Sequence, residues 1–220
     1  MSVVRPAKIQ PKEFAFSEET LKQAEKLVAK YPADRRRSAV IPLLWVVQKQ
    51  HENWLPLVAI KAVADYLGMP EIRVFEVATF YSMFNLQPVG KYFIQVCGTT
   101  PCMLAGSDEI IKLCKSRISP EERKVSEDGN FSWLEVECLG ACANAPMVQI
   151  NDDYFEDLDQ ESFARLLDDI VAGRKVKVGP QNTRFSSEPE DGPTVLEAYV
   201  KEGEEGLNAT AKIAESEWEF

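Results

Sequence analysis

Two pairs of cysteines constrain this chain more than any other feature of its 220 residues. Cys97 and Cys102 enclose Gly-Thr-Thr-Pro, and Cys138 and Cys142 enclose Leu-Gly-Ala. Each pair follows a run of residues typical of a strand, and the glycines permit backbone angles that a side chain would forbid. Two sulfurs on such a turning loop can point at one spot, and a second loop can close the other side. The pattern therefore favours one polynuclear metal site built by two loops.

The spacing and the composition narrow the choice of metal. Zinc sites of four cysteines usually contain at least one C-x₂-C pair, whereas both gaps here are longer. A Rieske centre needs two histidines on one iron, and His51 is the only histidine in the chain. A [2Fe–2S] cluster with four thiolates suits the wider loops, because the ligands must surround two irons. Zinc binding and thiol–disulfide chemistry stay open as alternatives.

The first half of the chain is predicted to be helical. Residues 1–16 form an extended arm, and Ser17 is a suitable N-cap for a first helix that Pro32 ends. A helical domain is expected over residues 17–88, with helices at about 18–31, 35–52, 56–68 and 70–81. Its end is rich in aromatic residues that suit a core or a partner surface equally: Phe75, Phe80, Tyr81 and Phe84. His51 is expected to be exposed.

The second half changes to a pattern of strands and helices. Strands are predicted at 92–96, 131–137, 147–150 and 154–155, and helices at 104–117 and 159–173. This order predicts a mixed sheet with helices packed against it, so the whole chain is of the α+β class. Both cysteine loops begin at the carboxyl end of a strand, where backbone N–H groups are free to donate to sulfur. Cys114 falls on the apolar face of the first helix and is predicted to be a core residue.

Composition limits the partners and the compartment. The net charge of −10 argues against a nucleic-acid ligand, whose phosphates would be repelled. Residues 180–220 form an acidic tail that cannot build a core and is expected to be extended or disordered. The longest apolar run is too short to cross a bilayer, and the first twenty residues lack the apolar region of a secretory signal. We therefore expect a reducing compartment, where metal binding is favoured over disulfides.

Several stretches of this sequence together resemble a known family. They are HENWL through ADYLG, VFEVATFYSMF, CGTTPC and ECLGACANAPM, and the likeness extends over roughly residues 15–178. They closely resemble the thioredoxin-like [2Fe–2S] subunits (24 kDa or E-type) of respiratory NADH:quinone oxidoreductase, complex I. The resemblance implies a helical N-terminal bundle followed by a thioredoxin-like [2Fe–2S] ferredoxin domain, here over residues 89–179. It also implies that the ligands of one [2Fe–2S] cluster are Cys97, Cys102, Cys138 and Cys142.

The resemblance further implies a function and partners. The chain would be an electron-transfer subunit of an oxidoreductase and translocase that reduces ubiquinone in the respiratory chain. It would pack against the subunit that binds NADH and FMN, exchange single electrons with that FMN, and join further iron–sulfur subunits of the peripheral arm. It would have no catalytic residue and no NADH, flavin or quinone site of its own, and no glycine-rich dinucleotide motif is present in the sequence. We expect a location on the cytoplasmic side of the inner membrane (the matrix side in a eukaryote), reached through the complex and without direct insertion.

Two alternatives to complex I remain at this point. A similar module serves NAD-dependent formate dehydrogenases and hydrogenases, so the chain could belong to the diaphorase part of such an enzyme. In a different class, the four thiols could belong to a zinc-stabilised or thiol adaptor protein. A thioredoxin-type redox site would carry C-x-x-C at a helix N-terminus, which this sequence lacks.

Overall fold

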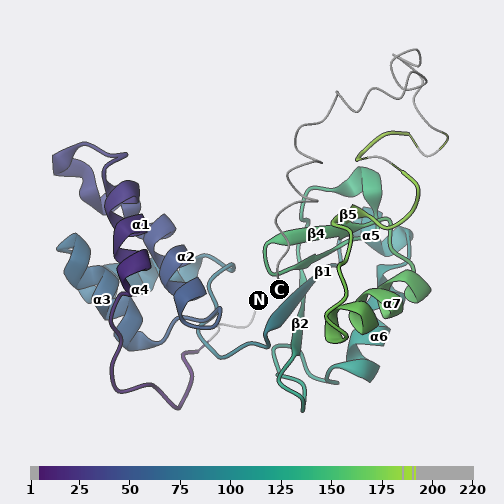
Figure 1. Ribbon diagram of the computed structural model, residues 1–220, viewed down its shortest axis with the longest axis horizontal. Coiled ribbons are helices and arrows are strands. Elements are labelled where there is room, and N and C mark those ends of the chain that lie inside the picture. The colour runs from purple at the N-terminus through teal and green to yellow at the C-terminus, as the bar shows by residue number, and fades with distance from the viewer. Residues whose placement is uncertain (1–4, 185, 190, 192–220) are drawn as a thin grey trace. The chain divides into compact units, whose positions relative to one another are not determined.

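The computed structural model describes residues 5–184, 186–189 and 191 (Figure 1). The chain divides into two compact units, Met1–Lys91 and Tyr92–Phe220, and each has its own hydrophobic core. Most of the predicted acidic tail lies outside the described residues. Within the described part, no helix is long and apolar enough to span a membrane.

The first unit consists of helices. In chain order they are α1 (Glu18–Val28), a 3₁₀ helix η1 (Ala33–Ala39), α2 (Val40–Gln50), α3 (Leu57–Leu67) and α4 (Glu71–Phe80). The Ser17 hydroxyl accepts a hydrogen bond from the Thr20 N–H at 3.1 Å, so the predicted N-cap is confirmed. Gly68 ends α3 in the left-handed conformation (φ 63°), which glycine adopts without steric cost.

The second helix begins later than predicted. A continuous helix from residue 35 is wrong, because the chain forms η1 first and starts α2 only at Val40. Pro42 explains the start, since proline is tolerated in the first turn of an α-helix but not in its interior. At Arg35 the backbone is non-helical (φ −116°, ψ 18°).

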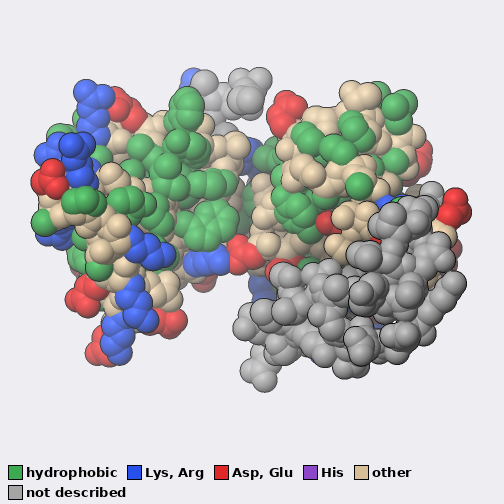
Figure 2. Space-filling model, turned by 90° about the horizontal axis from the view of Figure 1, so that it is seen from above, with side chains coloured by type: hydrophobic (Ala, Val, Ile, Leu, Met, Phe, Trp, Pro, Cys, Tyr) green, Lys and Arg blue, Asp and Glu red, His purple; other side chains and the backbone are tan. Residues whose placement is uncertain are grey.

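The aromatic residues at the end of this unit divide between its core and its surface. Phe84 is buried and Phe75 packs against the core, whereas Phe80 is 80% exposed and Tyr81 is also exposed. Figure 2 shows hydrophobic side chains gathered on one face of the helical unit. The expectation that His51 is exposed is wrong. Its ring is half-buried and packs edge-on against Trp54, with ring centroids 4.8 Å apart.

The second unit is a five-stranded mixed sheet with helices. Its strands are β1 (Tyr92–Cys97), β2 (Phe131–Val136), β3 (Val148–Ile150), β4 (Asp153–Glu156) and β5 (Gly179–Pro180), in the spatial order β2-β1-β3-β4-β5. Its helices are α5 (Thr100–Leu104), α6 (Ser107–Arg117), the short 3₁₀ helix η2 (Cys142–Asn144) and α7 (Gln160–Val171). The single predicted helix at 104–117 is wrong, because Gly106 (φ 108°) separates α5 from α6. The very short β5 was not predicted.

The core of the second unit lies between the sheet and two helices. Figure 1 shows α6 and α7 side by side, and their apolar faces pack with the strands. Trp133 on β2 is fully buried, and its Nε1 donates to the Ser119 carbonyl at 2.8 Å. Cys114 on α6 is fully buried in the same core, which confirms its predicted role.

The sheet topology brings both cysteine loops to one edge. β1 and β2 are neighbouring parallel strands, and Cys97 is paired with Val136 at their carboxyl ends. The Gly98 N–H donates to the Val136 carbonyl at 3.1 Å, so the two loops begin side by side. The Cys97 N–H donates to the Met147 carbonyl at 3.3 Å, which joins the start of the first loop to the chain that follows the second.

Candidate metal centre

The first loop holds its two cysteines inside the protein. Cys97 is the last residue of β1, and Cys102 lies within α5, whose first turn contains Pro101. Both side chains are 1% exposed and pack against Met147. The strand and the helix that carry them are consecutive in the chain, so local structure fixes this half of the site.

The second loop holds its two cysteines at the surface. Cys138 and Cys142 are exposed, and their sulfurs lie 3.5 Å apart. Between them Gly140 adopts a positive φ of 88°, which a side chain rarely tolerates. Cys142 then begins η2. The loop thus turns tightly enough to bring its two sulfurs together.

Backbone N–H groups point at the sulfurs of both loops. The amides of Thr99 and Leu139 donate towards Cys97, and the amide of Gly140 donates towards Cys138. The Met147 amide donates towards Cys102. Such donors stabilise thiolates and orient metal ligands. Because Leu139 belongs to the second loop, its amide also links the two halves of the site.

The two loops contain one low-pKa and one high-pKa thiol each. Burial opposes ionisation of Cys97, but hydrogen bonds, first from the Thr99 hydroxyl 3.4 Å from the sulfur, lower its pKa below the ordinary value. Burial, then the hydrogen bond with Cys97, raises the pKa of Cys102 to about 12.

In the second loop, the Gly140 amide and then the hydrogen bond from Cys142 lower the pKa of Cys138. The same Cys138–Cys142 hydrogen bond raises the pKa of Cys142. Each loop therefore ionises one thiol more readily than the other, and the second proton would leave on binding a positive metal.

The four thiols interact as one group across the two loops. The charge of Cys97 acts on Cys102, Cys138 and Cys142. Among the described residues, no three His, Cys, Asp or Glu side chains are grouped as they would be around one metal ion. A two-iron cluster is wider than one ion and is held by four thiolates. The donor set, four thiols without an imidazole, fits such a cluster; the assignment of the individual ligands stays a prediction.

The residues around the sulfurs include several that the sequence analysis did not identify. Thr99 lies inside the first motif and could have been found from its hydroxyl. Tyr154 on β4 donates its hydroxyl to the Leu139 carbonyl at 2.8 Å, and Arg184 Nη1 donates to the Ala143 carbonyl at 2.6 Å. Both come from distant parts of the chain, and no local sequence signal connects them with the cysteines.

Gly98 allows a close approach of β2 to the first loop. A Cβ atom at this position would lie 2.1 Å from the Glu135 carboxylate oxygen Oε1. Glu135 itself is exposed on β2. A carboxylate therefore lies directly against the backbone that follows Cys97.

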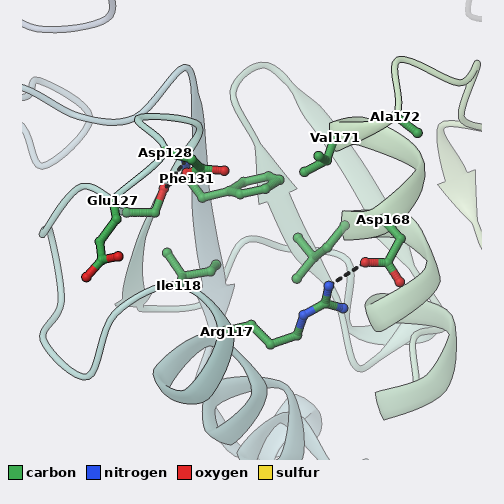
Figure 3. Close-up of a pocket in the computed structure, with 10 residues that line it drawn as sticks. Arg117, Ile118, Glu127, Asp128, Phe131, Asp168, Val171 and Ala172 are labelled. Carbon is green, nitrogen blue, oxygen red and sulfur yellow. Dashed lines mark hydrogen bonds and ion pairs between the residues drawn. The ribbon is translucent and has the colours of Figure 1, made fainter.

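A pocket of about 540 Å³ lies elsewhere in the second unit (Figure 3). It is lined by the ends of α6 and α7 and by the chain before and at the start of β2, including Ile118, Phe131 and Val171. An ion pair between Arg117 and Asp168 joins its two helices. No cysteine lines this pocket, so it is separate from the candidate metal centre.

Comparison with known proteins gives a family and several relatives. The family model described as thioredoxin-like [2Fe-2S] ferredoxin matches residues 24–171. An E-type component of the NADH-quinone oxidoreductase of Rhizobium meliloti (strain 1021) is 52% identical over 203 residues, 90% of this chain and 74% of that protein. The E-type component of the same enzyme in Rickettsia bellii (strain RML369-C) is 53% identical over 157 residues, 71% of this chain and 94% of that protein. "NADH dehydrogenase [ubiquinone] flavoprotein 2, mitochondrial" of Dictyostelium discoideum is 48% identical over 183 residues, 83% of this chain and 74% of that protein.

A solved structure shares the fold. An NAD⁺-reducing [NiFe]-hydrogenase in the H₂-reduced state matches with a TM-score of 0.52 and 20% identity over 60% of this chain. The chain spans 22%, about a fifth, of that hydrogenase chain. At this identity the likeness concerns the fold alone.

Proposed function

The chain belongs to the thioredoxin-like [2Fe–2S] ferredoxin family, and from this premise we propose that it is the electron-transfer subunit of an NADH:quinone oxidoreductase. Relatives with about half of their residues identical carry that enzyme's name and align with most of this chain. The family also confirms the predicted α+β fold with a thioredoxin-like ferredoxin domain. Like these relatives, the chain is a subunit of an oxidoreductase, and as a member of this family it holds one [2Fe–2S] cluster.

The convergence of four thiols at adjacent ends of β1 and β2 supports the ligand assignment. Cys97, Cys102, Cys138 and Cys142 hold the cluster, with two sulfurs from each loop. The cluster supplies storage and release of one electron at a time. The protein orients the ligands through backbone N–H groups, and the buried first loop excludes water from its side of the site. The exposed second loop presents its sulfurs to a redox partner.

The partner is the subunit that binds NADH and FMN, and no such cofactor is assigned to this chain. Met103 (47% exposed) and Leu104 (79% exposed) follow directly after Cys102 on α5. Exposed apolar residues beside a redox centre suit a protein interface. The subunit also joins the other iron–sulfur subunits of the peripheral arm, and it reaches the cytoplasmic face of the inner membrane, or the matrix face in a eukaryote, through the complex.

Spectroscopy of the anaerobically purified full chain tests the cluster. We expect about two irons and two sulfides per chain, and a paramagnetic resonance signal that appears only after reduction with dithionite. A colourless protein with stoichiometric zinc, or with no metal, would contradict the proposal and favour the adaptor alternative.

The docking face is tested with Leu104→Glu. A buried carboxylate without a partner is costly at an interface, so we expect weaker binding to the NADH- and FMN-binding subunit with an unchanged cluster spectrum. Val171→Glu is the matched control, since Val171 is also exposed in this unit but lies on α7. Equal binding by both variants would show that Leu104 does not contact the partner.

A hydrogenase or formate dehydrogenase module is the second candidate. The shared fold with the NAD⁺-reducing hydrogenase favours it only as a related module. Purified complexes distinguish the two: association with the quinone-reducing subunits supports the first candidate, and association with a hydrogenase or formate dehydrogenase catalytic subunit supports the second.

A further inference from the structure

The chain after α7 returns to the second cysteine loop. Strand β5 pairs with β4 in parallel, with Gly179 opposite Phe155, and the Gln181 N–H donates to the Glu156 carbonyl at 2.9 Å. We call residues 179–184 the return segment. It lies beyond residue 171, where the match to the family model ends. The alignment with the Rhizobium relative covers 90% of this chain and therefore includes it.

Arg184, the last residue of the return segment, contacts the chain next to a candidate ligand. Its Nη1 donates to the carbonyl of Ala143, the residue after Cys142, at 2.6 Å. Its Nη2 lies 3.5 Å from Asp157 Oδ1. The two charged side chains are only 12% and 7% exposed. This is a largely buried ion pair, unlike the exposed ion pairs elsewhere in this unit.

Asp157 and Asn144 extend the same network along the loop. Asn144 Nδ2 donates to Asp157 Oδ2 at 2.8 Å and also lies 2.8 Å from the Ser186 carbonyl. The Asp157 N–H donates to the Asn144 carbonyl at 2.8 Å. Arg184 therefore contacts two groups of this network: the carbonyl of Ala143, which follows Cys142, and the carboxylate of Asp157, which accepts from Asn144. Its Nε has no hydrogen-bond partner among the described residues, so the buried guanidinium retains a desolvation cost.

We propose that Arg184 is a positioning residue that fixes the Cys142 half of the candidate cluster site. The inference rests on the proposed function, because it takes Cys142 as a ligand. Without Arg184, Asp157 would be a buried charge without its partner, and the Ala143 carbonyl would lose its donor; both changes are costly. Leu139 and Ala141 pack against the buried first loop, but Cys142 itself is exposed, so the contacts of Arg184 with the adjoining residues fix the backbone that carries the Cys142 sulfur.

The position of the guanidinium also gives it an electrostatic effect. Reduction adds a negative charge to the cluster, which a nearby cation stabilises and a nearby anion disfavours. Removing the Arg184 charge should therefore lower the reduction potential, and removing the Asp157 charge should raise it. These shifts report the charges of the two partners, whereas iron release and hydrogen exchange of the loop report whether Arg184 positions it.

The test compares Arg184→Gln, Arg184→Lys and Asp157→Asn with Arg165→Gln in the full chain. Arg165 is the matched control, since its ion pair with Glu161 at 2.7 Å is exposed and lies on α7. The readouts are the rate of iron release to a chelator, the midpoint potential, and hydrogen exchange of the Asn144 and Asp157 amides. Changes to residues that support metal ligands typically reduce metal affinity or activity by about 10–100-fold.

We expect Arg184→Gln to release iron about 10–100-fold faster than wild type, with a lower potential and faster exchange at both amides. Arg184→Lys should keep the potential close to wild type but still release iron faster, because lysine cannot bind two acceptors as a fork. Asp157→Asn should raise the potential. Arg165→Gln should match wild type in every readout.

Two results would overturn the inference. One is iron release by Arg184→Gln at the rate of Arg165→Gln. The other is faster exchange confined to the return segment, with the Asn144 amide unchanged. A failure of this inference can be told apart from a failure of the proposed function. A wild-type chain that binds no cluster would contradict the proposed function. Hydrogen exchange of the metal-free chain would still test the contacts of Arg184.

Discussion

The two cysteine loops reach the same site by different means. The first is carried by β1 and α5, which are consecutive in the chain, and both of its sulfurs are buried. The second is exposed and is held by Tyr154 and Arg184, which lie later in the chain. A loop between a strand and a helix that directly flank it is positioned by those elements, whereas an exposed loop depends on contacts from residues distant in the sequence. The first loop therefore gives the site a rigid, buried half, and the second gives it a half that solvent and other proteins can reach.

The largest expected effect comes from replacing one proposed ligand in each loop. Cys102→Ser should abolish the cluster, because the buried serine hydroxyl is a poor ligand and water cannot reach the site to replace the lost thiolate. Cys142→Ser should leave some cluster with an altered paramagnetic resonance signal, because water or the serine oxygen can complete the exposed position. Iron per chain is the measurement. Cys114→Ala is the control and should retain the full cluster; equal iron loss in both ligand variants would contradict the comparison.

A glycine in the first loop tests how tightly that half is packed. Gly98→Ala would place a Cβ 2.1 Å from Glu135 Oε1; because the Glu135 side chain is exposed and can rotate away, the loss should lie at the low end for added volume, about 1 kcal/mol. Urea unfolding of the metal-free chain measures this loss. The double variant Gly98→Ala with Glu135→Ala should recover most of it, because the two positions are in contact. An additive double variant would show that the carboxylate is not the obstacle.

A single hydroxyl tests the support of the second loop. Tyr154→Phe removes the hydrogen bond to the Leu139 carbonyl and should cost about 1–2 kcal/mol, since it leaves that acceptor unpaired. Iron release should also accelerate. The discriminating observation is hydrogen exchange: we expect faster exchange at residues 139–142 and no change at residues 97–102. Equal changes in both loops would remove the distinction between them.

The smallest effect is expected for a helix cap outside both loops. The Ser162 amide and hydroxyl bind the Asp159 carboxylate and lower its pKa below the ordinary value. The stabilisation is therefore present above the ordinary pKa and is lost as the pH falls through the lower, folded-state value. Asp159→Ala should cost about 1 kcal/mol at pH 7 and less once Asp159 is protonated in the folded chain, because only the uncharged part of the cap then remains. Denaturant unfolding at several pH values measures this, and iron release should not change.

Local sequence patterns predicted most helices and strands, and they predicted that the two cysteine loops lie close together. Ser17, Gly68 and the apolar faces fixed most helices, because caps and periodicity act within a few residues. The two strands that precede the cysteines were also recognised, and their parallel pairing brings the loops together as expected. Where the local pattern was incomplete, the prediction failed: Gly106 divided one predicted helix, and Pro42 delayed the start of another.

Contacts between distant residues could not be read from the sequence. β5 is too short to show the alternation of apolar and polar residues typical of a strand, and its pairing with β4 depends on the path of the chain after α7. His51 looked polar by type, but its ring packs on Trp54. Arg184 stands in the segment that was predicted, from its composition, to be an acidic, extended or disordered tail. In each case the three-dimensional surroundings, not the residue type, decided the outcome.

The parallel pairing of β1 and β2 also sets the order in which the site can be made. Parallel neighbours need a long crossover connection, here the chain that contains α5 and α6. During synthesis, a ribosome that has released the first loop has delivered only two of the four thiols. The remaining two reach them only after β2 has joined the sheet. Under the proposed ligand assignment, insertion of iron and sulfide can therefore be completed only late in folding, and the thiols of Cys97 and Cys102 wait for their partners until then.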